Sequence, residues 1–137
     1  MDRLFFDTNV LLDVLEKRAP WFPDSTECLA RVRRGQAQGA VTAQSLSDIT
    51  YIQKSTPPAT LADTFLRLRE FLDIAPMTAG IVDEALTQRL PDLEDGFQLA
   101  AAQAWEATHL LTRNQKDFPS DSPLVVQHPA DYLRSRR

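Results

Sequence analysis

Short apolar runs alternate with longer segments of helical periodicity along this chain, and this alternation limits the folds open to it. Residues 4–6, 40–42, 109–112 and 124–126 form runs of strand length, and residues 73–76 form a strand or strand-like link. Helical segments separate these runs, so successive strands must be joined by crossovers, which produce parallel pairing. A parallel sheet needs cover on both faces. We therefore predict an α/β fold, a three-layer α/β/α sandwich around a central, mainly parallel sheet.

Local signals indicate where the intervening helices begin and which faces they bury. The tetrad at residues 24–27 (Asp-Ser-Thr-Glu) resembles a capping box and predicts that the second helix opens there. Thr78 is a candidate cap for a later helix, and the alanines within residues 100–104 would let another helix sit close to the sheet. The clearest helical stripe, at i, i+4, i+7 and i+11, consists of Leu61, Phe65, Leu68 and Leu72.

Length and composition favour one soluble domain. A chain of 137 residues fits a single domain, residues 1–137. No apolar run is long enough to cross a membrane, and the N-terminus turns acidic too early for a signal peptide. The only cysteine, Cys28, has no partner for an internal disulfide. These features predict a cytoplasmic protein.

The net charge of −4 argues against a protein that coats RNA or DNA by charge alone, because such proteins are normally basic. An acidic protein can still act on nucleic acid where a metal ion offsets its carboxylates, or where basic side chains gather locally. Arg31, Arg33 and Arg34 form one such local patch.

Four aspartates stand at or after strand-to-helix junctions: Asp7, Asp48, Asp95 and Asp117. In a parallel sheet the ligand crevice lies at the carboxyl ends of the strands, so the fold could bring them together. Clustered carboxylates repel one another unless a cation lies between them, and an all-oxygen site suits Mg²⁺ or Mn²⁺. Taken singly, each acid also fits a helix cap, a first-turn acid or a polar turn. Their joint placement favours the metal site.

Four segments, in this order, resemble the acidic motifs of PIN domains and together span nearly the whole chain. They cover residues 5–13, 45–51, 92–102 and 110–118. The resemblance implies a PIN-like α/β/α fold, Mg²⁺- or Mn²⁺-dependent RNA cleavage, and membership of the VapC class of toxin ribonucleases. It also implies a cognate antitoxin protein and a homodimer.

The same resemblance assigns roles to individual positions. Asp48 stands where glutamate is commoner in the family, and Gly96 stands where alanine is commoner. Asp92 is an additional carboxylate, which could hold the partners of Asp95 or a second metal ion. The metal-site acids are Asp7, Asp48, Asp95 and Asp117, and the polar residues that support them are Asn9, Thr112 and Asn114.

The leading hypothesis is therefore a metal-dependent endoribonuclease that is the toxin of a toxin–antitoxin pair, with Arg113 or the arginine patch holding RNA phosphates. One alternative is a catalytically inactive PIN-like module that binds RNA or protein. Another is an aspartate-based phosphatase or phospho-receiver. A haloacid-dehalogenase-type nucleophile segment would want a second aspartate at position 9, where this chain has Asn9.

Overall fold

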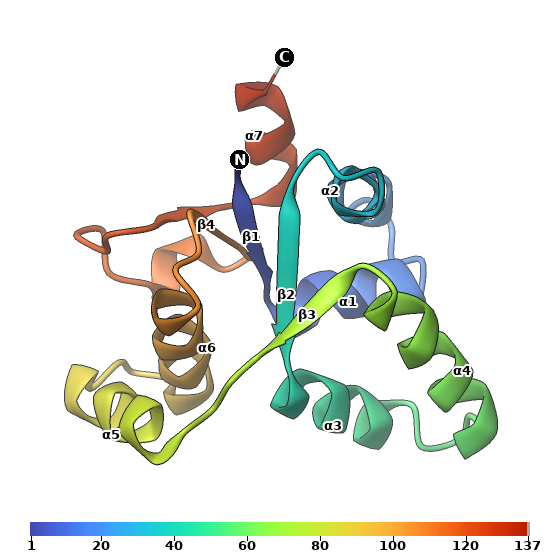
Figure 1. Ribbon diagram of the computed structural model, residues 1–137, viewed down its shortest axis with the longest axis horizontal. Helices are drawn as coiled ribbons and strands as arrows, with labels where there is room; N and C mark the ends of the chain where they lie inside the picture. Colours follow the sequence, from blue (N-terminus) through green and yellow to red (C-terminus); the bar gives the residue numbers. More distant parts are fainter. Residues whose placement is uncertain (137) are drawn as a thin grey trace.

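The computed structural model describes residues 1–136 and shows a parallel sheet between two helical layers (Figure 1). The strands are β1 (Arg3–Phe6), β2 (Gln38–Thr42), β3 (Leu72–Ala75), β4 (His109–Leu111) and β5 (Val125–Gln127). The helices are α1 (Thr8–Leu15), α2 (Phe22–Arg33), α3 (Ala43–Ile52), α4 (Pro58–Arg69), α5 (Ala79–Gln88), α6 (Leu93–Ala104) and α7 (Pro129–Ser135), with a 3-10 turn, η1 (Gln115–Asp117). The strand order is β3-β2-β1-β4-β5, and every pairing is parallel. The predicted three-layer α/β/α architecture is confirmed.

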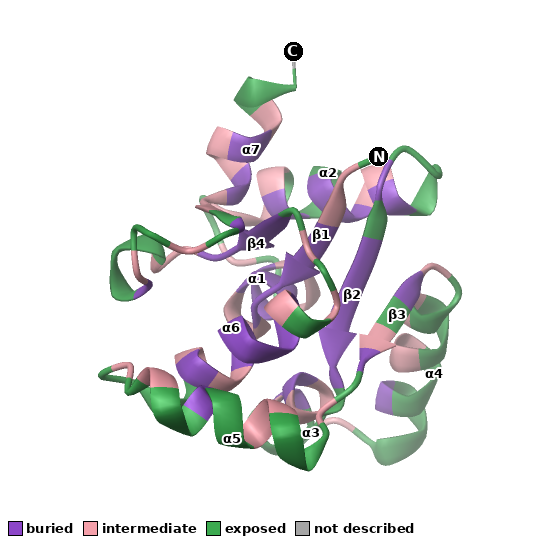
Figure 2. Ribbon diagram, turned by 60° about the vertical axis from the view of Figure 1, so that its left-hand side comes forward, coloured by how far each residue is buried: buried purple, intermediate pink, exposed green. Residues whose placement is uncertain are grey.

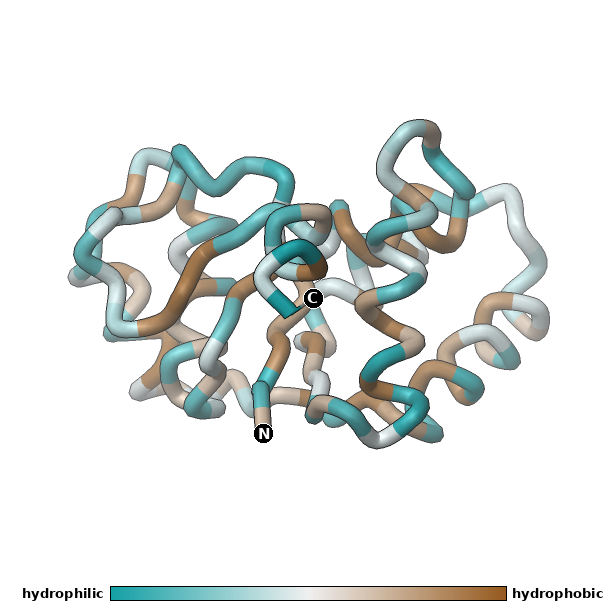
Figure 3. The backbone as a smooth tube through the Cα atoms, turned by 90° about the horizontal axis from the view of Figure 1, so that it is seen from above, coloured by the Kyte–Doolittle hydropathy of each residue, from teal (hydrophilic) through white to brown (hydrophobic). Residues whose placement is uncertain are grey.

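The central strand β1 supplies side chains to both cores, because successive residues of a strand point to opposite faces. Leu4 and Phe6 belong to the core under α1 and α2, whereas Phe5 belongs to the core under α6. All three are fully buried. Figure 2 shows this burial along β1, β2 and β4, and Figure 3 shows hydrophobic and hydrophilic stretches alternating along the chain.

Helix α6 approaches the sheet closely because its inward face is built from small side chains. Ala101 and Ala102 are fully buried beside Leu99 in the second core. Helix α5 packs against α6. Within residues 1–136, no helix is long and apolar enough to span a membrane.

Two local predictions were wrong. Helix α2 begins at Phe22 rather than at the tetrad 24–27, and its N-cap residue, Trp21, makes no side-chain cap bond. Pro23 lies in the first turn, where a missing N–H costs nothing, so the helix can start earlier than the capping signal indicated. Leu72 does not continue the α4 stripe either. That helix ends at Arg69, and Leu72 is the first residue of β3.

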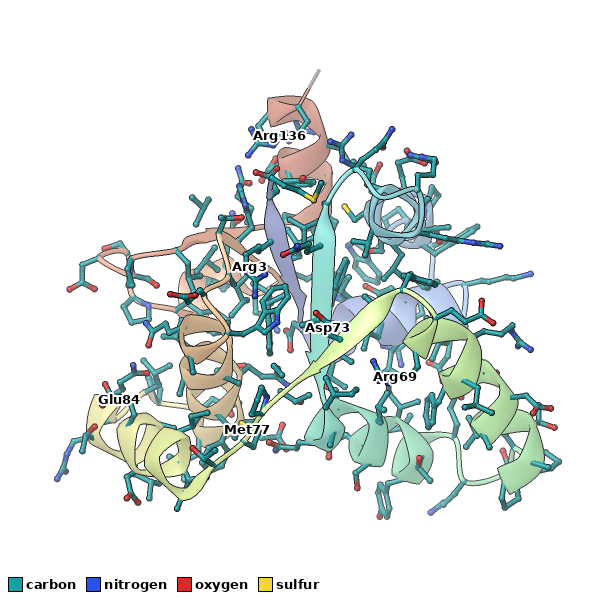
Figure 4. The ribbon with its side chains drawn as sticks, in the orientation of Figure 1. Arg3, Arg69, Asp73, Met77, Glu84 and Arg136 are labelled. Atoms are coloured by element: carbon teal, nitrogen blue, oxygen red, sulfur yellow. The ribbon has the colours of Figure 1, made fainter. Side chains whose placement is uncertain are left out.

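The carboxyl ends of β1, β2 and β4 meet at one edge of the sheet. The Asp7 N–H donates to the Leu111 carbonyl (3.0 Å), which extends the contact between the ends of β1 and β4. In Figure 1 this edge faces down toward α3, while both termini lie at the opposite end. Figure 4 marks that opposite end with Arg136, which follows α7. Side chains that follow the strands therefore converge far from the termini.

Candidate active site

A groove of about 350 Å³ opens at this edge, and six of its lining residues are carboxylic acids. Helices α1, α3 and α6 and the segment after β4 form its walls. The lining residues are Asp7, Thr8, Asn9, Leu12, Asp48, Tyr51, Ile52, Asp92, Glu94, Asp95, Gln98, Asn114 and Asp117. The fold thus brings the four predicted metal-site acids to one groove, together with Asn9, Asp92 and Asn114.

Asp7 lies at the N-cap position of α1, yet its carboxylate makes no side-chain cap bond. Instead it accepts a 2.8 Å hydrogen bond from the Thr112 hydroxyl, at the end of β4. Only 5% of Asp7 is exposed, and this burial raises the pKa of its carboxyl group, although the hydrogen bond from Thr112 opposes the shift. The helix-cap interpretation therefore does not account for this carboxylate. Thr112, which was predicted to support the acids, thus contacts the Asp7 carboxylate directly.

Asp95 lies in the first turn of α6, and its neighbour Asp92 caps that helix. The Asp92 carboxylate accepts from the backbone N–H of Glu94 (2.8 Å) and of Asp95 (3.4 Å), so the Asp95 carboxylate is not needed for the cap. Burial raises the pKa of Asp95 to about 6, and repulsion from Asp92, Asp7, Asp117 and Glu94 adds to the shift. Burial and neighbouring negative charges make the ionised form of this carboxyl group costly, and a bound cation would offset that cost.

Glu94 is an acid of the groove that sequence reasoning missed. Burial raises the pKa of Glu94, and the charges of Asp48, Asp92 and Asp7 raise it further. The negative charge of Asp48, on α3, thus repels that of Glu94. The charge of Asp117, in η1, likewise repels that of Asp95. The sequence signal that could have identified Glu94 is its position in the helix. It follows the N-cap residue Asp92 by two residues and lies in the same first turn as Asp95.

A small hydrogen-bonded network of uncharged side chains adjoins the acids, and the sequence analysis did not predict it. The hydroxyls of Thr8 and Ser45 are 2.7 Å apart, and Thr42 caps α3 through the Ser45 N–H (3.0 Å). The Gln98 amide nitrogen donates to Ser45 (3.0 Å) and to Thr8 (3.2 Å). This network ties the starts of α1 and α3 to α6, and so holds the three walls of the groove together.

Arg113, predicted to hold substrate phosphates, is engaged by a buried acid. Its guanidinium donates to Asp13 Oδ2 (2.7 Å) and Oδ1 (3.3 Å), and Asp13 is fully buried. The guanidinium carbon also lies 3.9 Å from the centroid of the Trp21 ring. The pair joins the segment after β4 to α1. A role for Arg113 in substrate binding stays a prediction.

The donor set of the groove suits a hydrated divalent cation. Across residues 1–136, no three His, Cys, Asp or Glu side chains converge into a ready-made metal cage. Mg²⁺ does not require one, because it usually keeps several waters and binds through one or two carboxylates. Asp7 and Asp95 both face the groove with a raised pKa caused first by burial, and a cation would offset that cost. These residues fit Mg²⁺ or Mn²⁺.

Comparisons with known proteins agree with this fold. A family model described as a PIN domain matches residues 3–116. A comparison with curated protein sequences finds no match.

Several solved structures share the architecture. One, described as a toxin–antitoxin complex from Klebsiella pneumoniae, is 24% identical with a TM-score of 0.70, over 92% of this chain and 97% of that chain. Another, VapBC2 from Rickettsia felis bound to a promoter DNA fragment, is 20% identical with a TM-score of 0.66, over 92% and 98%. VapBC-1 from nontypeable Haemophilus influenzae is 15% identical with a TM-score of 0.67, over 93% and 98%. At these identities the similarity shows a common fold.

Proposed function

The chain belongs to the PIN-domain family, and we propose that it is a divalent-metal-dependent endoribonuclease. The observation that carries the proposal is the pairing of Asp7 and Asp95 in one groove. They lie 88 positions apart, one directly after β1 and the other in the first turn of α6, and both have a pKa raised first by burial. Such carboxylates are costly as bare ions, and a bound cation would explain why the fold brings them together.

The predicted site residues have distinct parts in the proposed reaction. Bound Mg²⁺ or Mn²⁺ would supply Lewis-acid activation of water and neutralise charge on the phosphodiester. Asp7 and Asp95 would hold the ion, and Asp48 and Asp117 would complete the acidic set. Thr112 orients the Asp7 carboxylate through its 2.8 Å hydrogen bond, and Asn9 and Asn114 offer further polar groups in the groove.

Cleavage of a mixed RNA pool tests the proposal directly. We expect endonucleolytic products with Mg²⁺ or Mn²⁺ and none with EDTA, because the acids alone cannot offset phosphate charge. Titration with Mn²⁺ in the absence of RNA should show binding. A folded, pure protein that neither binds Mn²⁺ nor cleaves RNA would favour the alternative of a catalytically inactive binding module.

Protons and metal ions should compete for the groove. Because the pKa of Asp95 is raised to about 6, the proton must leave before the carboxylate can bind a cation. We expect the Mn²⁺ dissociation constant at pH 5 to be about tenfold that at pH 7, from the protonated fraction alone. Calorimetry at the two pH values measures both dissociation constants. An equal affinity at both pH values would contradict the assignment.

The proposed biological role is the toxin half of a toxin–antitoxin pair. Its support is the shared fold with proteins solved as toxin–antitoxin or VapBC complexes. The proposal includes a cognate antitoxin that restrains cleavage and a homodimer of this chain. Co-expression with the product of an adjacent small gene, followed by purification and sedimentation analysis, tests both partners. Uninhibited cleavage by a complex of the two would contradict the role.

A further inference from the structure

We propose that Tyr51, on the α3 wall of the groove, stacks against an unpaired base of the RNA beside the scissile phosphate. This inference rests on the proposed ribonuclease function and names a residue that grips its substrate. Tyr51 lines the same groove as the acids, yet 74% of it is exposed. It belongs to neither apolar core. An exposed aromatic ring beside a catalytic groove is therefore available for a ligand.

The position of Tyr51 relative to the acids suits one nucleotide. Tyr51 follows Asp48 by three residues on α3, so the two side chains share a helix face. At a rise of about 1.5 Å per residue, the Cα atom of Tyr51 lies about 4.5 Å further along the helix axis than that of Asp48. The hydrogen bonds of Thr42 and Thr8 with Ser45 hold the start of this helix. The helix that carries the ring is thus anchored next to the proposed metal site.

Lys54 places a positive charge over one face of the ring, so a base would stack on the other face. Its ammonium nitrogen lies 5.2 Å from the centroid of Tyr51. Going outward along α3 and the turn that follows it, the chain presents an acid, an aromatic ring and then a cation. That order matches a phosphodiester at the metal, an adjoining base on the ring and a further phosphate at the ammonium group.

The negative charge of the groove explains why RNA would need a contact that does not depend on charge. Six of the lining residues are carboxylic acids and the whole chain carries a net charge of −4, so the groove repels RNA. Arg113 directly precedes Asn114 of the groove, but its guanidinium group donates to the buried Asp13 carboxylate rather than facing a ligand alone. Base–aromatic stacking does not depend on phosphate charge, and unpaired RNA bases are commonly held this way.

The test measures binding of a short single-stranded oligoribonucleotide of mixed sequence, in an Asp95→Asn background that prevents cutting. We expect Tyr51→Leu to weaken binding by about 5- to 30-fold and Tyr51→Phe to retain it, because only the aromatic face is required. Lys54→Gln should reduce the salt slope of binding by about one, whereas Tyr51→Leu should leave that slope unchanged. Leu66→Ala, which trims an exposed apolar side chain on α4, is the matched control.

Abasic substitution identifies the stacked nucleotide. With the wild-type ring, one abasic position should weaken binding as much as Tyr51→Leu does, and the two changes together should cost no more than either alone. Equal binding by Tyr51→Leu and Leu66→Ala would overturn the inference. So would a change of oligomeric state in Tyr51→Leu, because the ring would then be a subunit contact. Absence of metal-dependent cleavage by the wild type, with RNA binding intact, would contradict the proposed function alone.

Discussion

Asp95→Asn is expected to abolish RNA cleavage, with a loss of at least about 10³-fold, and at the same time to stabilise the metal-free protein. Activity falls because asparagine cannot supply the negative charge that a cation needs at the start of α6. Asp7→Asn should cause a similar loss of activity, although its amide oxygen can still accept from Thr112. Cleavage with saturating Mn²⁺ measures both variants. Asp63→Asn, an exposed acid on α4 outside the groove, should cleave at the wild-type rate.

The gain in stability follows from the pKa of Asp95. The pKa is raised from 3.8 to about 6 in the folded state, so the folded protein holds this proton more tightly than the unfolded chain does. The stabilisation of the folded state by the protonated Asp95 carboxyl group is complete below about pH 4 and is lost as the pH rises through 6. After a discount for partial solvent exposure, we expect Asp95→Asn to add about 1 kcal/mol at pH 7.

Thermal unfolding in EDTA checks this expectation. The advantage of Asp95→Asn should be present at pH 7 and should shrink below pH 5, where the wild-type carboxyl group is also neutral. A variant that loses activity and also loses stability at pH 7 would instead indicate that Asp95 is needed for the fold.

Arg113→Met is expected to destabilise the protein by about 3 kcal/mol, because it leaves the buried Asp13 carboxylate without its main partner. The remaining cation, on Arg18, is 3.8 Å from Asp13 and is itself partly exposed. The substitution also removes the guanidinium from the Trp21 ring. Urea unfolding gives the change in the free energy of unfolding, and the melting temperature should fall by roughly 10 °C for a chain of this length.

A double variant separates the loss of a partner from the loss of packing. Asp13→Leu combined with Arg113→Met leaves no buried charge, so it should recover much of the stability that the single variant loses. If the double variant is as unstable as Arg113→Met, the cost lies in packing. RNA binding by folded Arg113→Met also tests the predicted phosphate contact, since a purely structural Arg113 would leave affinity unchanged.

Local sequence determined where most strands and helices lie and which acids follow them. Apolar runs bounded by turn residues located β1, β2 and β4, and acids that follow such runs pointed to Asp7 and Asp48. These features depend on neighbours within a few residues, so they can be read along the chain. The signal failed at α2, where a capping tetrad competed with a proline that the first helical turn tolerates.

The tertiary structure alone decided which hydrogen bonds and ion pairs join distant side chains. The order β3-β2-β1-β4-β5 places β4 beside β1, and so brings Thr112 to Asp7 across 105 positions of sequence. The same packing pairs Asp13 with Arg113, and joins Gln98 to Ser45. Strand order and register arise from burying both faces of the whole sheet at once. The acids were therefore visible in the sequence, while the hydrogen bonds and ion pairs that orient the groove depended on the complete packing of the fold.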